Sequence, residues 1–155
     1  PQSTRKGVEV TWMWSPTKYL DVHGNIAYLN TSIEEVSIFG DNTYFDRRHI
    51  LSPEWISNEN VTVRIRRNLA LTFTHHFMTE QFMELTNDPE FKVPGWSTFD
   101  INAQWELSEK VNIALMVNNV VNRQYYTYGA PDFNGNPAFL IQPPRNLFLA
   151  TKIRF

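Results

Sequence analysis

Apolar and polar residues alternate along most of this 155-residue chain. The stretch Pro144–Phe155 is typical, because every second residue from Leu147 to Phe155 is mostly apolar and those between are mostly polar. Successive side chains of a strand point to opposite faces, so this period of two predicts a strand with one apolar and one polar face. The stretch ends on an aromatic residue, whereas the last residues of soluble domains are usually frayed. We therefore expect this end to be closed by a partner strand or recognised during assembly.

The same alternation predicts seven strands, and no stretch sustains the 3.6-residue period of a helix. The predicted strands are Gly7–Ser15, Leu20–Thr31, Glu54–Arg66, Leu69–Phe82, Trp96–Leu107, Val111–Asn119 and Pro144–Phe155. Glu59 interrupts the apolar side of the third strand, which makes its first half the weakest part of the pattern.

Short and long connections take turns between these strands. The short ones are Ser15–Lys18, Arg67–Asn68 and Ser108–Lys110, and the long ones are Ser32–Pro53, Met83–Gly95 and Val120–Pro143. A meander with tight turns at one end and long loops at the other is typical of outer-membrane barrels, in which the turns are periplasmic and the loops extracellular. The strand lengths also fit a tilted span of about 9–11 residues.

The expected apolar face carries aromatic residues near both strand ends. Trp14 and Trp105, with Leu20, lie by the tight turns, and Tyr28, Trp96 and Phe99 are expected on the same face towards the loops. Aromatic belts of this kind mark the two interfaces of a membrane. A soluble antiparallel sheet with one solvated face gives the same alternation, but it does not explain the belts or the asymmetry of the loops.

Composition narrows the function classes. The net charge of -2 predicts no general affinity for polyanions, so no nucleic-acid partner is expected. The chain has no cysteine, which excludes disulfides and thiolate chemistry. No apolar run approaches the roughly 18 residues of a spanning helix. The polar start without methionine leads us to expect a processed chain or a piece of a longer one.

The segment Ala150–Phe155 resembles the C-terminal signal of bacterial outer-membrane proteins. In that signal, alternate hydrophobic residues end on a C-terminal aromatic residue, with a small residue shortly before. Ile153 and Phe155 hold the hydrophobic places here, and Ala150 stands where glycine is usual. The resemblance implies that the barrel-assembly machinery binds this strand.

Three further stretches resemble motifs of TonB-dependent outer-membrane receptors. They are Lys6–Val10 followed by Trp14-Ser15-Pro16, the penultimate-strand segment Val117–Tyr126, and Pro143–Asn146. This resemblance covers essentially the whole chain. It implies an all-β, antiparallel up-and-down transmembrane barrel of about 22 strands with a plug domain and a TonB-binding segment. We expect residues 1–155 to be about seven C-terminal strands of such a barrel, without the plug.

Candidate ligand contacts lie in the long loops. Arg47, Arg48 and His49 form a cationic run suited to an anionic ligand, with a solvated loop or a lipopolysaccharide contact as the alternative. Tyr125, Tyr126 and Tyr128 are candidates for stacking on a ligand above the barrel, and an interfacial belt explains them equally well.

Polar residues on the strands are expected to line a lumen. The candidates are His23, Arg64, His76, Asp100 and Gln104. His75 and His76 are adjacent in a strand, so they point to opposite faces and cannot hold one metal ion. Asp132–Asn136 starts like a calcium loop, but Gly135 and the prolines that follow are out of place, so a loop turn is expected. We expect no metal and no cofactor.

The sequence contains no motif that requires catalysis, so an enzyme is not expected. The resemblance implies TonB-dependent uptake of a scarce ligand: a siderophore–iron complex, haem, cobalamin, a metal or a glycan. The implied partners are membrane lipid with lipopolysaccharide, the rest of the barrel with its plug, TonB through the plug, and the assembly machinery. A passive porin, another outer-membrane barrel such as a barrel enzyme, and a soluble β-sandwich binding module remain as alternatives.

Overall fold

A computed structural model describes residues 2–38 and 42–155 and contains strands, turns and loops, with no helix in these two ranges. The strands are β1 (Ser3–Thr17), β2 (Leu20–Ile38), β3 (Asn42–Arg47), β4 (Trp55–Arg66), β5 (Leu69–Met78), β6 (Gln81–Phe82), β7 (Lys92–Val93), β8 (Trp96–Ser108), β9 (Val111–Asn118), β10 (Tyr126–Pro131), β11 (Pro137–Ile141) and β12 (Asn146–Ile153). No helix within the described ranges has the length and apolarity needed to cross a membrane.

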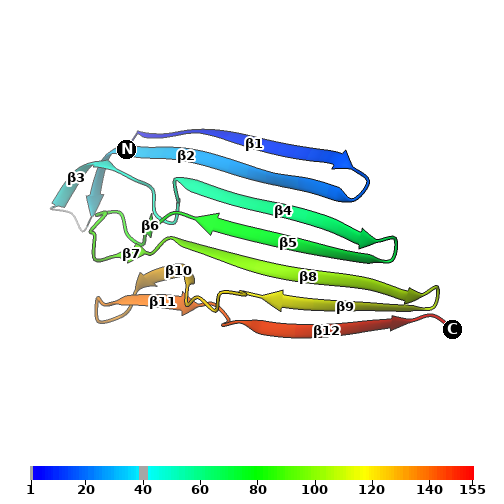
Figure 1. Cartoon of the computed structure of the whole chain (residues 1–155). Helices are drawn as coiled ribbons and strands as arrows, with labels where there is room; N and C mark the ends of the chain where they lie inside the picture. Colours follow the sequence, from blue (N-terminus) through cyan, green and yellow to red (C-terminus); the bar gives the residue numbers. More distant parts are fainter. Residues whose placement is uncertain (1, 39–41) are drawn as a thin grey trace.

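Seven long strands and the short β3 form one antiparallel sheet, in which the long strands follow the order β1-β2-β4-β5-β8-β9-β12 and β3 pairs with β2. Each strand pairs with the next long strand along the chain, so the sheet is an up-and-down meander (Figure 1). The three tight turns and the C-terminus lie at one end of the sheet, and the long connections lie at the other (Figure 1). We call these the turn end and the loop end. The seven predicted strands, their order and the asymmetry of their connections are confirmed, whereas the short strands β3, β6, β7, β10 and β11 were not predicted.

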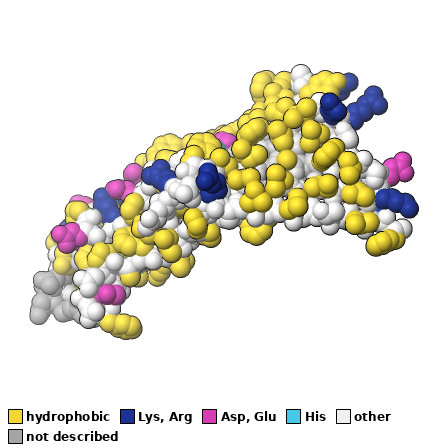
Figure 2. Space-filling model, turned by 60° about the horizontal axis from the view of Figure 1, so that its bottom comes forward, with side chains coloured by type: hydrophobic (Ala, Val, Ile, Leu, Met, Phe, Trp, Pro, Cys, Tyr) yellow, Lys and Arg dark blue, Asp and Glu magenta, His cyan; other side chains and the backbone are white. Residues whose placement is uncertain are grey.

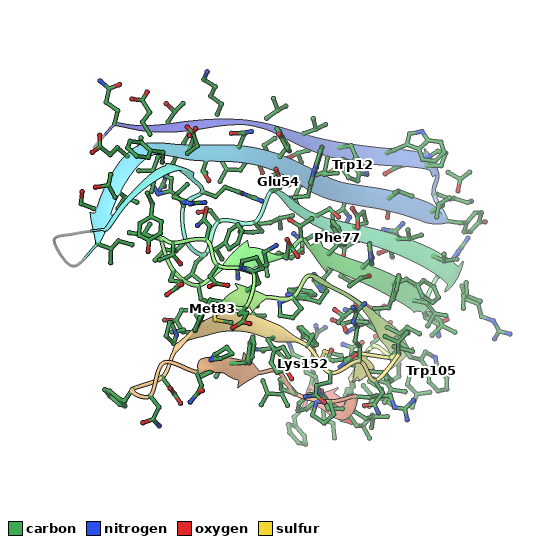
Figure 3. The ribbon with its side chains drawn as sticks, turned by 90° about the vertical axis from the view of Figure 1, so that its left-hand side faces the viewer. Trp12, Glu54, Phe77, Met83, Trp105 and Lys152 are labelled. Atoms are coloured by element: carbon green, nitrogen blue, oxygen red, sulfur yellow. The ribbon has the colours of Figure 1, made fainter. Side chains whose placement is uncertain are left out.

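The register places the predicted apolar residues of all seven strands on one face. Across neighbouring strands Val10 lies opposite Ile26, Val61 opposite Phe73, and Leu115 opposite Leu149. The other face, which we call the polar face, carries a row that includes Asn60, Thr74, Asp100 and Asn102. Gly24 lies opposite Trp12 on the apolar face. A Cβ at Gly24 would lie 2.6 Å from the Trp12 ring, so the absence of a side chain at this position leaves room for the ring (Figure 3).

A register shift lies next to each tight turn. The shifts fall between Trp14 and Thr17, between Arg64 and Arg66, and between Glu106 and Ser108. A two-residue turn pairs an odd-numbered residue with an even-numbered one, as in Arg66 opposite Leu69. The apolar residues of both strands would then face opposite ways, because a slip of one residue exchanges the faces. An extra residue in one strand of each pair restores the match.

Within residues 2–38 and 42–155, the sheet has no apolar core of its own. The described apolar residues that are buried are Ile33, Met83 and Val93, all towards the loop end. Met83 lies against Gly129 of β10, where a Cβ would come within 2.6 Å of the methionine methyl group (Figure 3). The apolar face is exposed instead, with Trp14 at 61 % and Leu149 at 67 % of full exposure. Hydrophobic side chains cover the strand part of the molecule in Figure 2. This face therefore requires a non-aqueous environment or a cover.

The predicted boundaries are wrong in the loops. The strand predicted to end at Thr31 continues to Ile38 and pairs with β3, although Glu34 and Glu35 hide the alternation. The strand predicted to end at Phe82 stops at Met78, and the last predicted loop contains the hairpin β10–β11. These segments pair locally at the loop end and bury only isolated residues such as Ile33 and Gly129, so no continuous buried face imposes a clear period on them.

Trp96 is not on the apolar face, where the sequence placed it. It lies opposite Met78 and has the same parity as Thr98 and Asp100, so its side chain belongs to the polar face. The aromatic belt of the apolar face towards the loops therefore includes Tyr28 and Trp55, whose ring centroids are 4.7 Å apart, together with Phe77 and Phe99.

Candidate functional site

A row of hydrogen bonds, continued by one contact between an imidazole and a carboxylate, crosses the polar face from β2 to the loop after β9. Asn58 Nδ2 donates to Asn25 Oδ1 at 3.4 Å, and Asn58 Oδ1 lies 2.7 Å from His76 Nδ1. On its other side His76 Nε2 lies 3.5 Å from Asp100 Oδ2. The backbone N–H of Asn119 donates to Asp100 Oδ1 at 2.7 Å. His76 and Asp100 thus belong to one network, as their common face predicted.

A hollow of about 430 Å³ opens at the loop end of this network. It is lined by His76, Trp96, Thr98, Asp100, Asn118, Asn119, Tyr125, Pro143 and Asn146. The rings of Trp96 and Tyr125 lie 4.8 Å apart at 44°. The buried Nε1–H of Trp96 has no hydrogen-bond partner among the described residues. Partial burial, with a smaller effect of the nearby Asp100 charge, raises the pKa of Tyr125, so its phenol remains a neutral donor at physiological pH. The hollow thus combines the aromatic surface of Trp96 and Tyr125 with the Tyr125 hydroxyl and, beneath the surface, the unpartnered Trp96 N–H.

A second group of polar residues lies further along the same face, where β1, β2 and β3 meet. Arg5 is opposite Thr31, and Ile33 is opposite Arg47, so these residues share the polar face. Arg5 Nη2 lies 3.3 Å from His49 Nδ1, and the backbone N–H of His49 donates to Thr31 Oγ1 at 3.1 Å. We call Arg5, Arg47 and His49 the cationic group.

Two atoms of the cationic group are buried without a hydrogen-bond partner among the described residues. They are Arg47 Nε and His49 Nε2. Buried polar atoms are normally satisfied, so these two are candidates for contact with a ligand or with water. An anion with several oxygen atoms suits this arrangement of donors.

Arg48 is separated from its two neighbours in the predicted cationic run. Its guanidinium lies 3.8 Å from the Glu54 carboxylate and over the ring of Phe82. Its backbone N–H donates to Asn87 Oδ1 at 2.5 Å, and its carbonyl accepts from Asn87 Nδ2 at 3.0 Å. Arg48 therefore links two of the long loops.

The three candidate tyrosines are also separated. Tyr125 lines the hollow, whereas Tyr126 packs against Phe139 of β11 with 4.7 Å between ring centroids. Gln124 Nε2 donates to the Tyr126 hydroxyl at 2.7 Å. Tyr128 lies in β10 and is about half exposed. Among the candidate tyrosines, Tyr125 is the one that the hollow includes.

The remaining polar candidates are spread along the polar face towards the turn end. His23 borders a hollow between β1, β2 and β4. Arg64 forms an ion pair with Asp21, which also accepts from the Ser15 hydroxyl at 2.7 Å. Gln104 borders a hollow with Ala114 and Ala150. These three residues lie on the predicted face but outside the loop-end hollow.

Three polar side chains form a chain on the apolar face, and the sequence did not predict it. His75 Nδ1 lies 2.7 Å from Glu59 Oε2, and His75 Nε2 lies 2.8 Å from Ser97 Oγ. The imidazole also stacks on Phe99, with 4.6 Å between ring centroids. We call Glu59, His75 and Ser97 the polar trio. His75 and His76 point to opposite faces, as predicted, and no cluster of three or more metal-ligating side chains occurs in the described ranges.

Asp132 organises the turn between β10 and β11. Its Oδ1 accepts from the backbone N–H groups of Asn134 and Asn136, both at 2.8 Å. Gly135 has a φ of 79°, a conformation that glycine adopts without strain. The hydrogen bonds from these backbone N–H groups lower the pKa of Asp132, although burial acts in the opposite direction. The expected loop turn is therefore present, and the Asp132 carboxylate is used to stabilise it through these hydrogen bonds.

The three residues of the proposed assembly signal lie on or just beyond β12. Ile153 is opposite Val111 on the apolar face, and Ala150 is opposite Ala114 on the polar face. Phe155 follows the strand at the turn end and is fully exposed. Within the described sheet, β12 pairs with β9 along one edge only.

A one-layer antiparallel meander with one apolar face, one hydrogen-bonded polar face and tight turns at a single end defines the wall of an outer-membrane β-barrel. Comparisons with known proteins agree with this class. The siderophore receptor PiuA from Acinetobacter baumannii superposes on 97 % of this chain with a TM-score of 0.83 at 15 % identity, and 22 % of PiuA is covered. The ferric yersiniabactin uptake receptor FyuA from Yersinia pestis superposes on 99 % with a TM-score of 0.82 at 19 % identity, and 24 % of FyuA is covered.

A sequence comparison leads to the same group of proteins. The pesticin receptor of Yersinia enterocolitica is 23 % identical over 152 residues, which is 96 % of this chain. The chain spans about a fifth of the length of such curated relatives, since 21 % of that receptor is covered. No family model matches the sequence. The predicted resemblance is confirmed, and the fold is that of the barrel strands of TonB-dependent receptors.

Proposed function

We propose that this chain forms part of the wall and three extracellular loops of an outer-membrane receptor. The apolar face then contacts lipid and lipopolysaccharide, and the polar face lines the lumen. The exposed apolar face supports this arrangement, because it has aromatic residues towards both ends and mainly aliphatic residues between them. Trp14 and Trp105 lie at the turn end, and Tyr28 and Trp55 lie towards the loop end.

The rest of the receptor must complete the wall. With seven strands in an up-and-down order, β1 and β12 run in the same direction, so they cannot pair with each other as antiparallel neighbours. An odd number of further strands is needed between them. A barrel of about 22 strands, the size of plugged outer-membrane transporters, needs about 15 more strands than the seven seen here. We assign residues 1–155 to the C-terminal part of such a barrel, and the plug and TonB-binding segment to the remainder of the protein.

The ligand that these observations favour is an anionic iron–siderophore complex, bound at the loop end and imported with energy delivered through TonB. The similar structures are those of siderophore receptors. Carboxylates and phenolates are strong acceptors for cationic donors. In the cationic group, Arg47 and His49 each have a buried nitrogen without a partner among the described residues. The loop-end hollow adds the Trp96 and Tyr125 rings below.

We infer no catalytic role. The polar trio has the hydroxyl–imidazole–carboxylate order of a nucleophilic relay, but it lies on the apolar face. The ligand is expected on the opposite side of the wall. The similar proteins are receptors rather than enzymes.

The proposal is tested by uptake of radiolabelled iron complexes into iron-starved cells that carry the full-length receptor. We expect uptake of at least one siderophore complex, and its loss in cells without TonB. Uptake that persists without TonB would indicate a passive pore. In binding assays, Arg47→Gln should weaken the affinity for an anionic complex at least about ten-fold, since bonds from charged donors contribute about 1.5–3 kcal/mol each. Arg48→Gln is the matched control, because Arg48 is already paired with Glu54.

A further inference from the structure

Four cationic side chains surround a small hollow at the turn end, far from the loops. They are Lys18 from the β1–β2 turn and Arg64, Arg66 and Arg67 from the end of β4 and its turn, and Tyr19 completes the lining. The hollow has a volume of about 170 Å³, which suits a small ionic group. We call these five residues, Lys18, Tyr19, Arg64, Arg66 and Arg67, the turn cluster. Lys and Arg side chains gather at this end of the molecule in Figure 2.

Most of this positive charge has no partner. Arg64 forms an ion pair with Asp21 and also lies 3.4 Å from the Lys18 carbonyl oxygen, so it ties the two turns together. Lys18 Nζ lies 5.0 Å from the centre of the Tyr19 ring. Among the described residues, no ion pair joins Lys18, Arg66 or Arg67 to a carboxylate. Unpaired cations held side by side repel one another, so an anion bound between them is stabilised.

The turn cluster lies at the boundary of the apolar band. Ile65, between Arg64 and Arg66 in the chain, lies in the register shift of β4 and is about half exposed. Tyr19 is also half exposed, and Trp14 on the neighbouring strand belongs to the apolar face. Tyr and Trp are enriched where hydrocarbon meets the polar headgroups. The cations therefore lie at headgroup depth when the apolar face contacts lipid.

We propose that the turn cluster binds the phosphate headgroup of an anionic phospholipid in the leaflet at the turn end. This inference rests on the membrane orientation in the proposed function. Arginine side chains bind phosphate oxygens in pairs of hydrogen bonds, which makes them suited to this group. The acyl chains of the same lipid extend along Ile65 and the apolar residues next to it. That combination of a cationic pocket and an adjoining apolar wall selects a lipid over a free anion.

Native mass spectrometry of the delipidated full-length receptor tests this proposal by titration with phosphatidylglycerol and, separately, with zwitterionic phosphatidylcholine. The test variant is Arg66→Gln/Arg67→Gln, which leaves the Arg64–Asp21 pair intact. The matched control is Lys110→Gln/Arg154→Gln, which removes two positive charges from the same end at another turn, where the Arg154 N–H bonds to the Lys110 carbonyl. Retention of the folded barrel is checked by heat-dependent migration in electrophoresis.

We expect the wild-type receptor to prefer phosphatidylglycerol. The test variant should lose about 25-fold in affinity, since each cation at a membrane surface contributes about five-fold. The control should change by less than about three-fold. Equal losses in both variants, or no preference for phosphatidylglycerol, would overturn the proposal. Displacement of the lipid by millimolar inorganic phosphate would overturn it in favour of a free-anion site.

If Arg66→Gln/Arg67→Gln fails to fold, Lys18→Gln/Arg67→Gln replaces it with the same expected loss. Iron uptake is measured on the same variants and should stay near the wild-type rate, because the turn cluster lies at the end opposite the loops. A receptor without uptake but with the specific lipid preference contradicts the proposed ligand function alone. A receptor with uptake but no lipid preference contradicts the turn cluster alone.

Discussion

A carboxylate on a lipid-facing wall is the most unusual single feature of this chain. Glu59 avoids an isolated charge because His75 bonds to it at 2.7 Å, and Ser97 bonds to the far side of the imidazole at 2.8 Å. Both Glu59 and His75 keep about 30 % of their side-chain surface exposed, so the pair is only partly desolvated. The three side chains satisfy one another's hydrogen-bonding groups, which lowers the cost of placing each of them on the apolar face.

A double-mutant cycle tests this mutual dependence. His75→Phe should destabilise the barrel by about 1–3 kcal/mol, because it leaves the Glu59 carboxylate without its partner on the apolar face. Glu59→Leu/His75→Phe should recover most of that loss, since a polar pair replaced by apolar residues is often neutral. The measurement is the urea midpoint of the full-length receptor in lipid vesicles. If the double variant loses as much as the two single variants added together, the residues act independently.

The sequence contained only part of the information on the polar trio. The charge of Glu59 on the apolar side was visible, and His75 was predicted on the face opposite His76. The pairing of Glu59 with His75 depends on the register shift between Arg64 and Arg66, which alternation alone does not locate. A plain two-residue turn at Arg67–Asn68 would have placed Glu59 opposite His76 instead.

At the scale of a strand, β8 gives the sharpest test of the two faces. Ile101 is on the apolar face opposite Phe73, and its neighbour Asn102 is on the polar face opposite Thr72. Ile101→Arg should cost about 2–4 kcal/mol of barrel stability, the usual penalty for arginine facing mid-membrane lipid. Asn102→Arg should cost much less, because its side chain enters the wet lumen. Equal urea midpoints for the two variants would show that the faces are assigned wrongly.

The β10–β11 hairpin shows what alternation cannot predict. Its strands pair only with each other, and Leu140 and Ile141 remain exposed. Gly129 is the one buried residue of these two strands, so no continuous buried face requires a clear period, and the sequence indicated only a loop rich in turn residues. The turn at Asp132–Asn136 was predictable from the sequence, since Asp, Asn and Gly residues favour turns.

The Asp132 turn predicts a pH dependence confined to this hairpin. Hydrogen bonds from backbone N–H groups lower the pKa of Asp132 in the folded turn below its ordinary value of 3.8. A carboxylate with a lowered pKa stabilises the fold above its unfolded pKa, and this contribution is lost as the pH falls through the folded pKa. NMR of asparagine-labelled receptor should show the Asn134 and Asn136 amides titrating below pH 3.8. In Asp132→Asn the same amides should not titrate, and a wild-type midpoint at or above 3.8 would contradict the assignment.

At the scale of the molecule, the order of strands was predictable because it follows from local signals. Each tight turn, such as Arg67–Asn68, joins two strands that pair directly. The sites were less predictable, since they combine residues far apart in the chain. Arg5 meets His49 across 44 positions, and Tyr125 meets Trp96 through a loop without a regular period. Neither contact leaves a sequence motif.

Phe155 supplies the last prediction. It lies beyond β12 at the turn end and is fully exposed, so packing of its ring does not stabilise the described part of the fold. We expect its role in assembly, through the proposed binding of β12 by the assembly machinery, and not in the proposed ligand site at the opposite end. Deletion of Phe155 should lower the amount of folded receptor in the outer membrane several-fold and leave the affinity of the remaining receptor for the proposed iron–siderophore complex unchanged. Deletion of Phe133, an equally exposed aromatic residue at the β10–β11 turn, is the control and should leave the yield intact. A normal yield without Phe155 would contradict the assembly role of this strand.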